Sequence, residues 1–125
     1  NGSVNIYEKI DHIEIVIRDL EESIDFYKSV LEFDPVKRVE MGDHDSIEEL
    51  AYLKLGDTLL ELISVENPAE STGDDWKIGY RAIAIEVDDM ESALEELPEN
   101  VEVTRGPRDM GNFKRAEIED SNGLR

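Results

Sequence analysis

The chain has 125 residues, of which 39% are hydrophobic, and this is enough to build one domain around one core. It has no cysteine, which excludes disulfides, thiolate metal sites and cysteine nucleophiles. Its 32 acidic and 13 basic residues give a net charge of −19, which argues against nucleic acid or an anionic membrane surface as a partner. No apolar run is long enough to cross a membrane, so we expect a cytoplasmic protein.

The first half of the chain predicts the element order β-α-β-β-β. Residues 10–17 place Ile13, Ile15 and Ile17 at the two-residue period of a strand. Residues 20–31 repeat apolar side chains at helical spacing and begin with acidic residues, which the helix dipole favours there. Three further strands are predicted at 36–41, 50–55 and 58–65, the last two joined by a tight turn at Gly56 and Asp57.

The second half reads as a repeat of the first after a polar, turn-rich linker. Residues 80–89 predict a strand that leads into a helix at 90–97, followed by strands at 101–104 and 113–119 with a loop at 105–112. A constant spacing of 70 residues pairs Ile13 with Ile83, Ile15 with Ile85, Ile17 with Val87 and Asp19 with Asp89. Four matches at one spacing indicate an internal repeat.

These residues resemble a known family. Residues 11–33 read DHIEIVIRDLEESIDFYKSVLEF, which is similar to the opening of a module in the glyoxalase/bleomycin resistance/dioxygenase (vicinal oxygen chelate) superfamily, with Glu32 where the family usually has glycine. The similarity continues at 58–62, at 84–89 and in the turn at 120–123. The resemblance implies an α+β fold in which two βαβββ modules form a curved, cup-like mixed sheet.

The module boundaries follow from the repeat and the linker. We expect one domain, with module one at about 8–66, a linker at about 67–78 and module two at about 79–125. The last strand of module two is missing from this layout, because only Leu124 and Arg125 follow the turn that should precede it. We therefore expect the natural chain to continue past Arg125, or a strand from a partner chain to fill the gap.

The resemblance also implies a metal site in the cup. Family enzymes usually hold a divalent ion with a His on the first strand and a Glu on the fourth strand of each module, and here His12 and Glu61 match the first-module pair. Such a half-site suits Zn, Ni, Fe, Mn or Co. Ala82 stands where the second His should be and has no donor atom. His44, in a polar loop, is the best substitute ligand.

Three carboxylates are candidates for the chemistry. Glu14, Glu61 and Glu86 should point into the cup because they lie on the strand faces opposite the apolar residues. A carboxylate beside a metal-polarised oxygen would be a suitable proton shuttle, and the alternative is that some of these groups are solvated at the rim.

Two functions lead at this point, and a scaffold whose function is its dimer interface is the third alternative. The first is a glyoxalase-like metal-dependent lyase or isomerase acting on a small substrate with vicinal oxygens, with lactoylglutathione lyase or an epimerase as the nearest reaction types. The second is a metal-free protein that sequesters a small molecule, as bleomycin-resistance members do, and Ala82 favours it. A homodimer is expected in either case.

Overall fold

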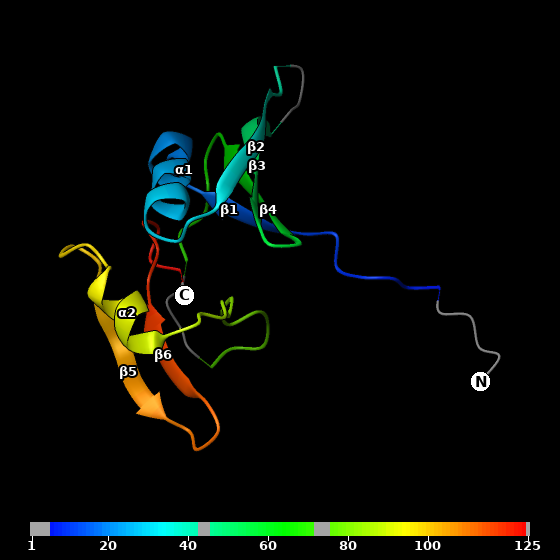
Figure 1. Cartoon of the computed structure of the whole chain (residues 1–125). Coiled ribbons are helices and arrows are strands. Elements are labelled where there is room, and N and C mark those ends of the chain that lie inside the picture. The colour runs from blue at the N-terminus through cyan, green and yellow to red at the C-terminus, as the bar shows by residue number, and fades with distance from the viewer. Residues whose placement is uncertain (1–5, 43–45, 72–75, 125) are drawn as a thin grey trace.

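A computed structural model of the chain describes residues 6–42, 46–71 and 76–124. The fold is mixed α+β with a curved, unclosed mixed sheet, as predicted (Figure 1). The sheet contains β1 (His12–Ile17), β2 (Asp34–Glu40), β3 (Ile47–Leu55) and β4 (Thr58–Val65), in the order β1-β4-β3-β2. β1 runs parallel to β4, whereas β3 is antiparallel to both β4 and β2. The first half therefore has the predicted β-α-β-β-β order.

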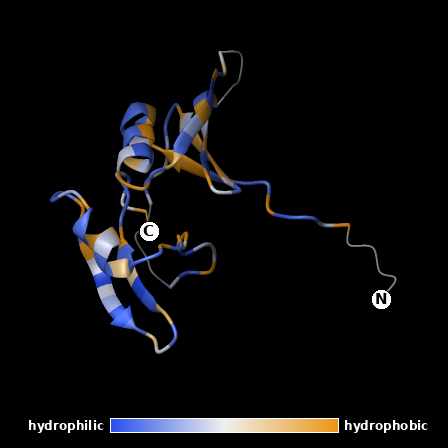
Figure 2. Cartoon of the chain, viewed as in Figure 1, coloured by the Kyte–Doolittle hydropathy of each residue, from blue (hydrophilic) through white to orange (hydrophobic). Residues whose placement is uncertain are grey.

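Helix α1 (Leu20–Ser29) covers one face of this sheet. Asp19 caps its N-terminus by accepting a hydrogen bond from the backbone N–H of Glu22 at 3.0 Å, which stabilises such a helix end by about 1 kcal/mol. Leu20 and Tyr27 on the buried side of the helix pack against strand residues of the core, which are Ile17, Ala51, Leu53, Leu60 and Leu62. Figure 2 shows hydrophobic residues gathered where α1 meets the sheet.

The chain leaves α1 through a backbone conformation that residues other than glycine rarely adopt. Glu32 has a φ of 62°, in the left-handed region that glycine favours. This is the position at which the family pattern has glycine. Phe33, the next residue, is 4% exposed and joins the core, so the turn at Glu32 directs an anchoring side chain inward.

The second half forms a separate hairpin beside a short helix. α2 (Met90–Glu95) precedes β5 (Val103–Asp109) and β6 (Lys114–Ile118), which pair antiparallel in a two-stranded sheet. The prediction of a loop at 105–112 was wrong over most of its length. β5 continues through Gly106 and Pro107 because the ladder shifts register between Arg105 and Arg108, and a bulge of this kind accommodates a Gly-Pro pair within a strand.

The predicted strand at 80–89 is also wrong as a strand. Residues 80–87 carry no helix or strand, and no described residue forms a ladder with them. In the first half, β1 is held by β4, which lies between β1 and β3. Among the described residues no strand takes the place of β4 in the second half, and the repeated sequence forms no ladder with any of them.

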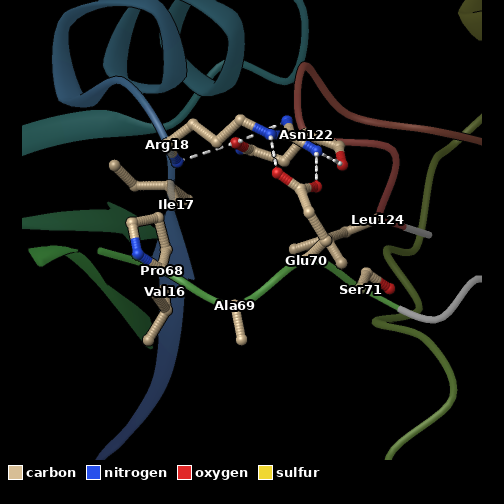
Figure 3. A pocket seen from close by; sticks show the side chains of 9 residues that line it. All are labelled: Val16, Ile17, Arg18, Pro68, Ala69, Glu70, Ser71, Asn122 and Leu124. Atoms are coloured by element: carbon tan, nitrogen blue, oxygen red, sulfur yellow. Dashed lines mark hydrogen bonds and ion pairs between the residues drawn. The ribbon is translucent and has the colours of Figure 1, made fainter.

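A turn near the end of the described chain connects the two halves (Figure 3). The Tyr27 hydroxyl donates to Asp120 at 2.6 Å, and the side-chain amide of Asn122 donates to Ser23 at 3.0 Å. The side-chain oxygen of Asn122 accepts from the backbone N–H of Arg18 at 3.0 Å, and the Arg18 guanidinium pairs with Glu70 at 3.1 Å. We call these contacts of residues 120–122 with Arg18, Ser23 and Tyr27 the inter-half latch.

The helices offer no route across a bilayer. In the part of the chain that the structure describes, neither α1 nor α2 has the length and apolar character that a membrane-spanning helix requires.

Candidate metal centre

Strand register brings three chemically active side chains to one place. β1 pairs in parallel with β4 so that Glu14 lies opposite Glu61, and His12 lies opposite Leu59. Because side chains alternate along a strand, His12 and Glu14 share a face with Glu61, while Ile13 and Ile15 pack against the core on the helix side. The predicted orientation of His12 away from the helix is confirmed.

The imidazole of His12 lies among carboxylates. Its Nδ1 atom is 2.9 Å from Asp11, and its Nε2 atom is 3.1 Å from Glu14 and 3.5 Å from Glu61. Hydrogen bonds to Asp11 and Glu14 raise the pKa of His12, and the charge of Glu61 adds to the rise. The surroundings therefore favour a positive charge at this position, whether a proton or a metal ion supplies it.

Burial differs across the cluster. The Glu61 side chain is 8% exposed, that of His12 is 28% exposed and that of Glu14 is 59% exposed. One ligand atom from each of the three residues lies within 4.8 Å of the others. Glu61 therefore lies at the buried end of the cluster and Glu14 at its solvent-exposed end, where a small molecule could approach.

Tyr52 is a further member of the site that the sequence analysis missed. It lies opposite Glu61 in the β3–β4 ladder, and its ring meets the His12 ring edge-on at 5.9 Å between centroids. A hydrogen bond from its hydroxyl to Glu61 raises the pKa of Tyr52, with desolvation and the charge of Glu61 adding to the effect. The sequence contains the information needed to find Tyr52. The tight turn after Leu55 fixes the hairpin register and so places residue 52 opposite residue 61.

The other predicted residues do not join the cluster. Glu86 is exposed, lies in the segment without a ladder and is not part of the three-residue group. Ala82 is exposed in the same segment and has no donor atom. His44 lies outside the described residues.

A hollow of about 120 Å³ lies beside the latch, away from the His12 cluster. Arg18, Glu70 and Asn122 line it together with apolar side chains from the end of β1 and from the linker (Figure 3). The charge of Arg18 is already matched by Glu70, and the hydrogen-bonding groups of Asn122 serve the latch. This hollow is therefore part of the connection between the halves.

Comparison with known proteins decides the family. The sequence profile of the glyoxalase/bleomycin resistance protein/dioxygenase superfamily matches residues 9–125. The chain belongs to this superfamily. The resemblance seen in the sequence is confirmed, and the match covers both halves of this chain. A comparison with curated proteins found no match.

Solved structures of the same superfamily share the fold. A glyoxalase family protein from Enterococcus faecalis is 23% identical, with a TM-score of 0.78 over 96% of this chain and 95% of that chain. The trypanothione-dependent glyoxalase I of Leishmania major is 22% identical, with a TM-score of 0.74 over 94% of this chain and 83% of that chain. The fosfomycin resistance protein FosX from Mesorhizobium loti is 18% identical, with a TM-score of 0.69 over 95% and 88%. At these identities the likeness concerns the fold.

Proposed function

We propose that the protein is a glyoxalase-like, metal-dependent lyase or isomerase that acts on a small substrate with vicinal oxygens. Lactoylglutathione lyase and epimerase reactions are the nearest types. The observation that carries the proposal is the convergence of His12, Glu14 and Glu61, whose ligand atoms lie within 4.8 Å of one another. The glyoxalase I neighbour supports the same reaction class.

The donor set fits a divalent ion of the borderline class. One imidazole nitrogen and two carboxylate oxygens suit Zn²⁺, Ni²⁺, Fe²⁺, Mn²⁺ or Co²⁺. Ligand atoms about 2.1 Å from a tetrahedral ion lie about 3.4 Å apart. The separations from His12 Nε2 to Glu14 and to Glu61, 3.1 and 3.5 Å, bracket that spacing. His12 and Glu61 are the proposed metal ligands, and an ion bound there would polarise the oxygens of the substrate.

The proposed roles of the remaining groups follow from how exposed each one is. Tyr52 holds the buried carboxylate of Glu61 by donating a hydrogen bond, which fixes its orientation before anything binds. Glu14, which is exposed and 3.1 Å from His12, is the proposed group for moving a proton to or from a substrate at the open side. Glu86 would contribute to proton transfer only if the segment at 80–87 closes over the cluster.

Replacing the histidine tests the metal site directly. In His12→Ala we expect loss of binding in a calorimetric titration with Zn²⁺ or Ni²⁺, with a melting temperature of the metal-free protein close to that of the wild type. Glu95→Gln, at an exposed position on α2, is the control and should bind normally. Glu61→Gln should weaken binding. Unchanged metal affinity in His12→Ala would rule out the site.

A second function has one observation in its favour. Ala82 provides no donor where the family pattern has a second His, which supports a metal-free protein that sequesters a small molecule. Dialysis against a chelator distinguishes the two functions. A metal-dependent enzyme should lose thermal stability when its ion is removed, and a metal-free binding protein should not change.

We further propose that the protein is a homodimer, since the second half buries little apolar surface within one chain. Light scattering at micromolar concentration should then give about twice the mass of one chain. A monomer at every concentration would contradict this.

A further inference from the structure

The two ring nitrogens of His12 have different surroundings. Nε2 lies 3.1 Å from Glu14 and 3.5 Å from Glu61, within the group of possible metal ligands. Nδ1 lies 2.9 Å from the carboxylate of Asp11, which precedes β1 and is not a member of that group. Asp11 therefore contacts the imidazole on the side that an ion bound to Glu61 would leave unused.

The surroundings also indicate which nitrogen is the better ligand. The Nε2 side offers two carboxylates, and one of them, Glu61, is 8% exposed and so is shielded from competing water. The Nδ1 side offers Asp11, whose side chain is 75% exposed. The two nitrogens point in diverging directions from one ring, so an ion that is held together with the buried Glu61 uses Nε2.

A metal ligand needs a free electron pair, and this requirement involves Asp11. A neutral imidazole carries one hydrogen, on either Nδ1 or Nε2, and only the other nitrogen can bind an ion. Glu14 accepts a hydrogen bond from Nε2 and so stabilises the form whose Nε2 cannot bind metal. An ionised carboxylate only accepts hydrogen bonds, so the contact of Asp11 with Nδ1 stabilises the opposite form.

We propose that Asp11 is a positioning residue for the metal site, which accepts a hydrogen bond from Nδ1 of His12 and keeps the electron pair of Nε2 available to a divalent ion. This inference rests on the proposed metal-dependent function and adds a residue on which that function depends. A partner of this kind also fixes the orientation of the ring and makes the ligand nitrogen more basic. Because Asp11 and His12 are adjacent in sequence, little chain entropy is lost when the contact forms.

Two substitutions at Asp11 separate its hydrogen bond from its charge. Asp11→Ala removes both, and we expect the affinity for Zn²⁺ in a calorimetric titration to fall about tenfold, the lower end of the range for lost outer partners, because Asp11 is open to water. Asp11→Asn keeps a carbonyl oxygen that accepts the hydrogen bond, and its affinity should stay within about threefold of the wild type. Glu8→Gln, at an exposed acidic residue of the same segment, is the control for charge and should leave the affinity unchanged.

A second measurement reports the tautomer of His12 without any metal. Long-range proton–nitrogen NMR spectra of the metal-free protein, at a pH that keeps the ring neutral, distinguish a nitrogen that carries hydrogen from one that does not. The chain has two histidines, so His12→Ala identifies the signals of His12. We expect hydrogen on Nδ1 in the wild type and in Asp11→Asn, and a shift of hydrogen to Nε2 in Asp11→Ala. A merely structural role of Asp11 would not move the tautomer.

The outcomes separate this inference from the proposed function. Equal losses of affinity in Asp11→Ala and Asp11→Asn would mean that only the charge matters, and this result would overturn the inference. An unchanged affinity or an unchanged tautomer in Asp11→Ala would overturn it as well, and all of these results would leave the metal site standing. A wild-type protein that binds no Zn²⁺ would overturn the proposed function and this inference together.

Discussion

The two halves of this chain share a sequence pattern but differ in how they pack. The buried residues of the described structure lie between Ile17 and Ile63, in the first half. In the described residues of the second half, large apolar side chains such as Tyr80, Val87 and Phe113 are exposed instead. Both halves have an aspartate-capped helix, with Asp19 and Asp89 accepting hydrogen bonds from backbone N–H groups of the first turn.

A repeated sequence pattern is therefore not sufficient to form a repeated core. In the first half, β4 pairs with β1 on one side and with β3 on the other, and it contributes the buried residues Leu60 and Leu62. The strand at the middle of the sheet therefore converts an apolar pattern into burial. Residues 80–87 have the pattern, but no strand of the described residues pairs with them. Ile83 packs against the core, whereas Ile85 and Val87 stay exposed.

The largest effect should come from core truncation in the two halves. Leu62→Ala removes a side chain that is fully buried, and we expect a loss of about 2–5 kcal/mol in the free energy of unfolding. Ile85→Ala, at a 36% exposed position, should cost well under half as much. Urea denaturation measures both. Equal losses would mean that the second half has a core of its own in solution.

Tyr52→Phe tests the candidate metal site formed by His12, Glu14 and Glu61. Without the hydroxyl, Glu61 loses the hydrogen bond that orients it, and loss of such a supporting contact typically lowers metal affinity 10- to 100-fold. Glu86→Gln, in the second half, should leave the affinity unchanged. Calorimetric titration with Zn²⁺ measures both variants. A larger effect from Glu86→Gln would place the working site across both halves.

Tyr27→Phe tests how firmly the halves are joined. It removes the hydroxyl that donates to Asp120 across the inter-half latch, and one such hydrogen bond stabilises a protein by about 1 kcal/mol. Tyr80→Phe, at an exposed hydroxyl, is the matched control and should have no effect. Limited proteolysis should also cut the second half of Tyr27→Phe sooner. Identical melts and identical cleavage would show that the latch contributes nothing.

The smallest effect is a predicted gain in stability at Glu32. Its φ of 62° disfavours any side chain, so Glu32→Gly should stabilise the fold by roughly 0.5–1 kcal/mol. Glu102 stands 70 residues later and does not have a positive φ, so Glu102→Gly should destabilise slightly. Thermal melts distinguish the two signs. Destabilisation by Glu32→Gly would show that the side chain itself contributes more than the strain costs.

Much of the first half could be predicted because local patterns and pairing agree there. The limits of β4 were predicted exactly, and α1 was predicted to begin at Leu20 as it does. The second half was predicted less well, since alternation at 80–87 predicts a strand but cannot supply the neighbour that makes one. Likewise, residues 105–112 were predicted as a loop, although β5 continues through Gly106 and Pro107 with a bulge.

The candidate site was likewise predictable where local patterns were sufficient. His12, Glu14 and Glu61 could be placed on one face from alternation and the family pattern, and the structure brings them together. Tyr52 required counting the register through the hairpin turn, which depends on two strands at once. Whether Glu86 faces the same cup depends on how residues 80–87 pair, and no property of that segment alone determines this.

The latch has a consequence for the order in which the chain matures during synthesis. A ribosome completes β1 to β4 when it has added Val65, so the sheet and α1 can assemble while the second half is still being translated. Until Asp120 and Asn122 emerge, the hydroxyls of Tyr27 and Ser23 lack the partners that the finished fold gives them. A nascent chain stalled before residue 120 should therefore resist proteases in its sheet, while α1 is held less firmly than in the complete chain.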